Sequence, residues 1–175
     1  FQHEYPRLDL LIIYGSSAQN NWYPDVEARN LFDINGKLKI IPKCAEMWDA
    51  GYRCALVPDY AISDGRIKIN GDKISFNGHE FTHCLFMHPQ YAKKEVFELL
   101  DAAGVSGVKI AAVGKANLDF DAQPVALHIP CYEEFSLDIL NDMDCPKSAI
   151  PGGCVARDGS FVLTSEGGLL RGERT

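Results

Sequence analysis

The sequence predicts a three-layer α/β sandwich, in which a mostly parallel sheet carries helices on both faces and is joined by a β-hairpin insertion and a loop-rich or β-rich C-terminal tail. Short apolar runs alternate with helical segments over the first two thirds of the chain, as expected when strands are buried on both faces. Turn residues end each run. A length of 175 residues with 46% hydrophobic residues is enough for one core.

Four segments are predicted to form the sheet. They are nearly continuous apolar runs rich in aromatic and β-branched residues. They are residues 8–14, 53–58, 81–87 and 108–113, and they end at Gly15, Pro58, Pro89 and Gly114. Ligands bind beyond the carboxyl ends of the strands in such sheets, so we expect a pocket there.

Two helices are predicted between these strands. Residues 89–103 have apolar side chains at helical spacing, begin at Pro89 and stop at Gly104. Residues 42–50 form a shorter helix that Gly51 ends. Residues 16–37 are polar and rich in turn residues, so they are expected to leave the core.

Two further segments have the pattern of hairpins. Residues 65–78 alternate apolar and polar residues and turn at Asn-Gly pairs, and residues 152–164 turn at Asp158-Gly159. Between them, five carboxylates within residues 133–144 are typical of a solvated face rather than a calcium loop. We therefore expect an α/β domain at 1–124 and a C-terminal appendage at 125–175 that begins a β-rich module.

The pentapeptide at residues 79–83 reads H-E-x-x-H, the zinc-protease motif, in which two histidines on one helical face bind Zn²⁺ and the Glu activates water. It follows the predicted hairpin and overlaps a predicted strand, where residues four apart are separated by about 13 Å at ~3.3 Å per residue. Both rings cannot then reach one ion at about 2.0–2.1 Å. We expect no metal site; the alternative is a zinc-dependent hydrolase using His79, Glu80 and His83.

Six cysteines are scattered along the chain without a C-x-x-C pair. Cys54 and Cys84 fall in predicted strands, where a free cysteine behaves as a small hydrophobic residue. Cys131, Cys145 and Cys154 lie in the tail, where one disulfide is plausible in an exported protein, the pair being left open.

The net charge of −7 argues against nucleic acid and anionic membranes as partners. No apolar run is long enough to span a bilayer. The chain begins at Phe1 rather than Met, so we expect an excised piece of a longer protein whose signal peptide would not be visible. An extracytoplasmic location, periplasmic or secreted, is favoured.

The order of the elements carries a family resemblance. The segment 50–59, a hairpin with Asn77-Gly78, a strand ending at Pro89, a helix ending at Gly104 and a strand ending at Gly114 follow one another. Over residues 8–120 this order resembles the class I glutamine-amidotransferase-like, flavodoxin-like domain of multidomain glycoside hydrolases, as in some β-galactosidases and α-L-rhamnosidase-like proteins. Such domains support trimerisation in β-galactosidases, so the resemblance implies other domains of the parent chain, and a possible homo-oligomer, as partners.

The resemblance does not extend to amidotransferase chemistry. In amidotransferases proper, the strand matching residues 108–113 runs into a G-x-C-x-G turn whose cysteine attacks the amide. Residues 111–116 read Ala-Ala-Val-Gly-Lys-Ala, with no thiol at the turn. The resemblance therefore implies a non-catalytic accessory domain of a larger carbohydrate-active enzyme, for assembly or for framing the substrate cleft, with no cofactor.

Candidate ligand-binding residues come from the predicted strand ends and from aromatic side chains. They are Tyr14, Trp22, Asp59, Tyr60, His88 and Lys115. Asp59 is a possible glycosidase carboxylate without a convincing second one. A stand-alone sugar-binding module, using the aromatic members of this set and His88, is one alternative. A cysteine hydrolase using Cys84 with His83 or His88 as base is another, although a cysteine inside a strand is typically an inert, buried thiol.

Overall fold

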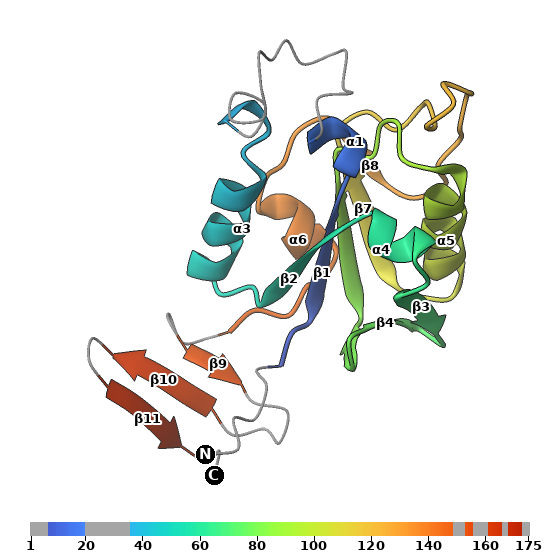
Figure 1. The fold of residues 1–175 in the computed structure, drawn as a ribbon. Helices are drawn as coiled ribbons and strands as arrows, with labels where there is room; N and C mark the ends of the chain where they lie inside the picture. Colours follow the sequence, from blue (N-terminus) through green and yellow to red (C-terminus); the bar gives the residue numbers. More distant parts are fainter. Residues whose placement is uncertain (1–6, 20–35, 149–152, 156–160, 166–167, 173–175) are drawn as a thin grey trace.

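The core of the chain is a five-stranded parallel sheet, seen in a computed structural model that describes residues 7–19, 36–148, 153–155, 161–165 and 168–172 (Figure 1). The strand order is β2-β1-β6-β7-β8, and every neighbouring pair is parallel. The strands are β1 Leu10–Tyr14, β2 Cys54–Pro58, β6 His83–Met87, β7 Lys109–Val113 and β8 Cys131–Tyr132. The predicted parallel sheet is therefore confirmed, and its strand order reverses between β1 and β6.

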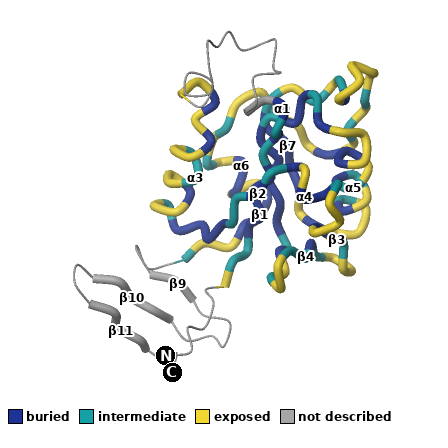
Figure 2. Tube along the Cα trace, in the orientation of Figure 1, coloured by how far each residue is buried: buried dark blue, intermediate teal, exposed yellow. Residues whose placement is uncertain are grey.

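Helices cover both faces of this sheet (Figure 1). Successive strand side chains point to opposite faces, so Leu10 and Ile12 pack on one side while Leu11 and Ile13 pack on the other. The first side is covered by α3 (Ile40–Asp49) and α6 (Asp138–Asp142). The second is covered by α4 (Tyr60–Ser63) and α5 (Lys94–Val105). Figure 2 shows the sheet as the buried centre of these layers.

The predicted hairpin insertion is the first part of a three-stranded antiparallel sheet formed by β3 (Ile67–Asn70), β4 (Lys73–Phe76) and β5 (His79–Phe81). Between β4 and β5, Asn77 and Gly78 both have positive φ, 48° and 76°, as a type I′ turn requires. Ile67, Ile74 and Phe81 point from this sheet into the core beside α5. The small sheet therefore packs against the α5 side of the domain core.

The segment after Pro124 adds to the same layers. β8 pairs with β7, and Ile139, Leu140 and Met143 of the α6 region are buried in the core on the α3 side. A separate antiparallel sheet follows, made of β9 (Gly153–Val155), β10 (Phe161–Ser165) and β11 (Gly168–Gly172). The predicted turn at Asp158-Gly159 lies outside the described residues, although β9 and β10 do pair antiparallel.

The clearest predicted helix begins later than its pattern indicates. α5 starts at Lys94 rather than Pro89 because the intervening residues bind the loop that follows β7. The Gln90 Oε1 accepts hydrogen bonds from the amides of Asn117 and Leu118, at 3.0 and 3.3 Å. Tyr91 has a left-handed φ of 63°, which interrupts helical geometry. The helix also continues past Gly104 to Val105. In the part of the chain that is described, no helix is long and apolar enough to cross a bilayer.

Candidate functional site

The carboxyl ends of β1 and β6, where the strand order reverses, touch each other directly. The Gly15 amide donates to the Met87 carbonyl at 2.9 Å. A Cβ atom on Gly15 would lie only 1.9 Å from the His88 carbonyl oxygen. Ligands of open parallel sheets bind in the crevice at such a reversal. Here the backbones of the two strand ends are in direct contact, which favours a ligand site elsewhere along the same edge of the sheet.

Three of the predicted ligand-binding residues lie together at the ends of β1 and β2. The Asp59 amide donates to the Tyr14 carbonyl at 3.0 Å, and Tyr60 follows as the first residue of α4. Burial, then Tyr60, then Asp59 raise the pKa of Tyr14. Tyr60 is 50% exposed, with the Arg66 guanidinium 5.7 Å from its ring centroid. These residues form a partly open tyrosine cluster around one carboxylate.

The Asp59 carboxylate itself is closed off from solvent. It is 3% exposed, and its Oδ1 has no hydrogen-bond partner among the described residues. Burial raises its pKa, while the hydroxyl and amide of Ser16, the amide of Tyr60 and the charge of Lys93 act in the opposite direction. A carboxylate held in this way braces the Ser16 segment and is poorly placed to meet a substrate.

We expect the Asp59→Asn variant to be more stable than the parent chain at pH 7. The raised pKa means that the folded state binds a proton more readily than the unfolded state, whose pKa is 3.8. Stability contributed by this group therefore falls as pH rises above 3.8, and the neutral amide removes that loss. Urea unfolding at pH 7 and below pH 4 measures the effect, with the exposed Asp72→Asn as control. A variant that is less stable than the parent at pH 7 contradicts the expectation.

His88 is half-buried at the ends of β1, β6 and β7, and its ring packs against the domain itself. Its φ of 56° turns the chain sharply after β6, and its ring packs where a Cβ on Gly114 would be 3.2 Å from Nδ1. Burial and then the charge of Lys43 lower the pKa of His88 to about 4, while the Leu38 backbone acts in the opposite direction. The imidazole is therefore neutral at pH 7 and fills space behind the edge of the sheet.

An open cavity of about 710 Å³ lies at the carboxyl ends of β7 and β8. Its walls are the turn after β7, Leu127 and the segment that forms and follows β8. The lining residues are Gly114, Lys115, Ala116, Asn117, Leu127, Cys131, Tyr132, Glu133 and Glu134. This volume is in the range of about 300–1,000 Å³ typical of small-molecule sites. Lys115 is the predicted site residue that lies here.

The cavity has a mainly apolar lining with several polar groups on it, and its one thiol is not activated. Cys131 lines it, but burial and then Asp101 raise the pKa of its thiol, so the neutral form prevails at pH 7. Glu134 also acts on Lys43 of α3, where its charge partly offsets the lowering of the Lys43 pKa by burial. An ammonium, two carboxylates, an amide and a phenol therefore surround one open space, which suits recognition of hydroxyl groups.

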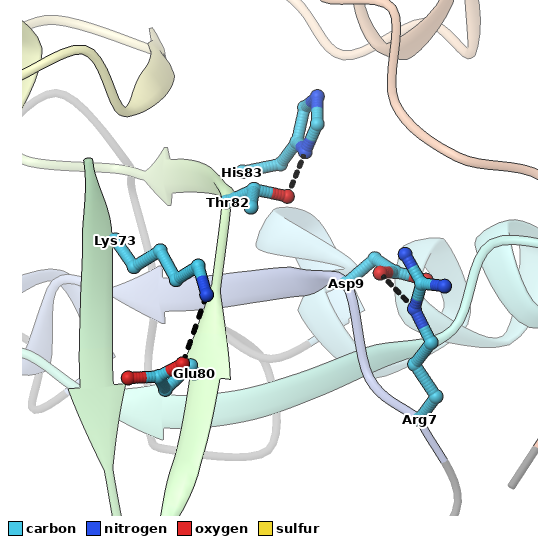
Figure 3. A network of polar contacts seen from close by, with 6 residues as sticks. All are labelled: Arg7, Asp9, Lys73, Glu80, Thr82 and His83. Atoms are coloured by element: carbon cyan, nitrogen blue, oxygen red, sulfur yellow. Dashed lines mark hydrogen bonds and ion pairs between the residues drawn. The ribbon is translucent and has the colours of Figure 1, made fainter. Parts of the chain in front are cut away.

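The H-E-x-x-H segment is extended, as its surroundings predict. His79 lies on β5 and His83 on β6, so the helix needed for the zinc-protease arrangement is not formed. Glu80 accepts a hydrogen bond from Lys73 Nζ at 3.0 Å (Figure 3). It accepts another from Asn70 Nδ2, also at 3.0 Å. Within the described ranges, no group of three or more His, Cys, Asp or Glu side chains could hold a metal ion.

His83 has a structural environment of its own. It is 7% exposed, with Nδ1 2.8 Å from Thr82 Oγ1 (Figure 3) and Nε2 3.1 Å from the Met143 carbonyl oxygen. Burial lowers its pKa, so a neutral ring links β6 to the segment that ends α6. The same strand buries Cys84 completely, and burial raises the pKa of that thiol far above neutrality. Neither residue is poised for hydrolysis.

The tail cysteines that lie in the described residues are not joined to each other. Cys131 is an exposed free cysteine and Cys145 a buried one. The side chain of Cys154 and the predicted ligand-binding residue Trp22 lie outside the described residues.

The predicted site residues thus form a tyrosine–aspartate cluster, a half-buried histidine and one lysine in a separate cavity. Tyr132 and Asn117 of that cavity were not predicted, because a two-residue strand leaves no periodic pattern. No protein-family model matches the chain, and no curated protein matches it either.

Proposed function

We propose that the chain is a non-catalytic accessory domain of a larger carbohydrate-active enzyme, a glycoside hydrolase, and that it contacts carbohydrate through the cavity at the ends of β7 and β8. The strand order supports a flavodoxin-like fold of the class I glutamine-amidotransferase type. In chain order the five parallel strands lie 2-1-3-4-5, which is the flavodoxin-like arrangement.

The lining of the cavity carries the proposal. Sugars present hydroxyl groups together with apolar ring faces, and sites that bind them combine aromatic side chains with a few polar groups. Tyr132 offers a half-buried ring, while Lys115, Asn117 and Glu133 offer donors and acceptors. All of them lie at the edge of the sheet where parallel α/β domains bind ligands.

The environments of the reactive side chains at this edge of the sheet support a non-catalytic role. Asp59 is buried and His88 is half-buried with a lowered pKa, and the turn after β7 offers Lys115 where an amidotransferase has its nucleophile. Glu133 and Glu134 are adjacent in sequence, and Glu134 acts on Lys43 of a neighbouring helix. Glycoside hydrolysis needs two carboxyl groups that face each other across a sugar about 5–10 Å apart. These groups favour binding over bond cleavage.

A titration with galactose and with rhamnose, followed by amide chemical shifts of the 175-residue chain, tests the proposal. We expect weak, saturable shifts at residues 114–117 and 131–134. The Tyr132→Ala variant should weaken binding about fivefold, because stacking on an aromatic ring contributes about 1 kcal/mol. Tyr60→Ala is the matched control, since it removes an exposed tyrosine from the other end of the same edge.

Two results would contradict the proposal. Binding that is lost in Tyr60→Ala and kept in Tyr132→Ala would move the carbohydrate site to the tyrosine cluster at β1 and β2. Hydrolysis of an aryl glycoside by the purified chain, abolished by Glu133→Gln, would make the domain catalytic.

A further inference from the structure

A small basic pocket lies at the opposite end of the sheet, where β1 and β2 begin. Its walls come from the segments that precede these strands and from the segment that follows α6. The lining residues are Arg7, Asp9, Gly51, Arg53, Pro146, Lys147 and Ser148. The cavity measures about 130 Å³, which corresponds to roughly four water molecules at ~30 Å³ each. It has room for one small chemical group rather than for a whole sugar.

The charge of this pocket is opposite to that of the chain. Arg7, Arg53 and Lys147 are cations and Asp9 is the single carboxylate, so the lining residues carry a formal charge of +2. The whole chain carries −7. Like charges gathered around a concave surface reinforce one another and concentrate ions of opposite sign. The pocket is therefore expected to attract anions, although the protein as a whole is acidic.

Two of the cations are held in place by aromatic rings. The Arg53 side chain is 6% exposed, donates from Nη1 to the Trp48 carbonyl at 3.0 Å, and has its guanidinium 4.7 Å from the Trp48 ring centroid. The Lys147 ammonium lies 5.5 Å from the Tyr52 ring centroid. Such cation–π contacts fix the direction of a flexible side chain. The positive groups are positioned before any ligand arrives.

The backbone of the pocket is also tightly fitted. The Ser148 amide donates to the Gly51 carbonyl at 2.9 Å, and a Cβ on Gly51 would lie 2.8 Å from the Ser148 carbonyl oxygen. Gly51 has a φ of 99°, which a residue with a side chain rarely adopts. At the mouth, the more exposed Arg7 is oriented by Asp9, with Nε 2.8 Å from Oδ1 (Figure 3).

We infer that this pocket binds a small oxyanion group, a phosphate, a sulfate or a carboxylate. Guanidinium groups match the geometry of such oxyanions and can donate two parallel hydrogen bonds, while an ammonium adds a point charge. The pocket supplies two guanidinium groups and one ammonium around a space of the right size. It lies at the other end of the sheet from the proposed carbohydrate cavity, so it is a second site that does not depend on the first.

A titration of the 175-residue chain with sodium phosphate at constant ionic strength tests this inference, with amide chemical shifts as the readout. We expect saturable shifts at Gly51 and Ser148. The exposed Lys147→Gln and Arg7→Gln variants should each weaken phosphate binding about tenfold, because each removes a charge-assisted hydrogen bond to the anion. Lys68→Gln, which removes an exposed lysine on β3, changes the net charge equally and should leave the affinity unchanged.

The inference is overturned if the shifts do not saturate, if they spread over the surface, or if all three variants behave alike. Parallel titrations with sulfate and acetate identify the source of the anion. Tighter binding of phosphate and sulfate indicates a small-molecule oxyanion. Tighter binding of acetate indicates a carboxylate, such as a side chain from another domain of the parent protein.

Discussion

Replacing Gly15 with alanine is expected to lower the free energy of unfolding by about 3 kcal/mol, the upper end of the usual cost of overpacking. The added Cβ would lie 1.9 Å from the His88 carbonyl oxygen and 3.0 Å from its carbonyl carbon. Both neighbours are backbone atoms at the end of a central strand, so no side chain can rotate away. The ends of β1 and β6 must separate, which also strains the hydrogen bond from the Gly15 amide to Met87.

Urea unfolding followed by circular dichroism measures this loss. Gly36→Ala is the matched control, because a Cβ there meets no atom within 4 Å and the residue has helical geometry. That change should be neutral or slightly stabilising, since alanine is favoured over glycine in a helix. A loss below about 1 kcal/mol for Gly15→Ala, well under the range expected for overpacking, would mean that the two strand ends are not closed on each other.

The contact between Gly15 and His88 also connects the end of β1 to the end of β7. Gly15 touches His88, His88 packs against Gly114, and Gly114 lines the cavity that we propose for carbohydrate. We therefore expect a displacement at β1 to reach β7 across β6, because the groups between them are in direct contact. Gly15→Ala should accordingly alter the amide shifts of Gly114 and Lys115, whereas Gly36→Ala should not.

The sheet could be predicted from the sequence because its strands carry a strong local signal. Residues 8–14, 53–58 and 108–113 are apolar runs bounded by turn residues, and β1, β2 and β7 fall within them. The strand at residues 81–87 was also predicted, although Thr82 separates β5 from β6. β5 pairs with β4, whereas β6 pairs with β1 and β7. The choice of partner strand cannot be read from the residue pattern of the segment.

The start of α5 and the positions of the site residues could not be predicted, because they depend on contacts between distant segments. The Gln90 side chain binds the amides of Asn117 and Leu118, 27 and 28 residues away. His88 was predicted to meet a ligand because it ends a strand, but its left-handed backbone directs it against Leu38 and Gly114. Lys115, which was predicted as a ligand-binding residue because it follows a strand, does line a cavity. The basic pocket had one local signal, a charged Arg53 at the start of an apolar strand segment.

Acidification is expected to lower the free energy of unfolding by about 3 kcal/mol between pH 6.5 and pH 4 through His88 alone. Burial, followed by the charge of Lys43, lowers the pKa of His88 in the folded chain from 6.5 to about 4. Between these two values the unfolded chain binds a proton that the folded chain does not. Stability therefore falls as pH drops through this window, by about 1.4 kcal/mol for each pH unit that separates the two pKa values.

Two other titratable groups, His83 and Asp59, also contribute to the pH dependence of the free energy of unfolding. The pKa of His83 is also lowered by burial, so it adds to the loss of stability below pH 6.5. The raised pKa of Asp59 acts in the opposite sense, because the folded chain takes up its proton more readily as pH falls toward 3.8. The contribution of His88 must therefore be read from a difference between two chains rather than from one profile.

His88→Asn isolates that contribution, because asparagine tolerates the left-handed backbone at this position and does not titrate. The variant should be less stable at pH 7, where it loses the packed ring, yet its unfolding free energy should change less between pH 6.5 and pH 4 than that of the parent. Lys68→Gln, which removes an exposed side chain on β3, should keep the parent's slope. If His88→Asn and the parent fell in parallel, the imidazole would already be hydrated in the folded chain. The edge of the sheet between β1 and β7 would then be open to water, and a ligand could enter at the strand reversal after all.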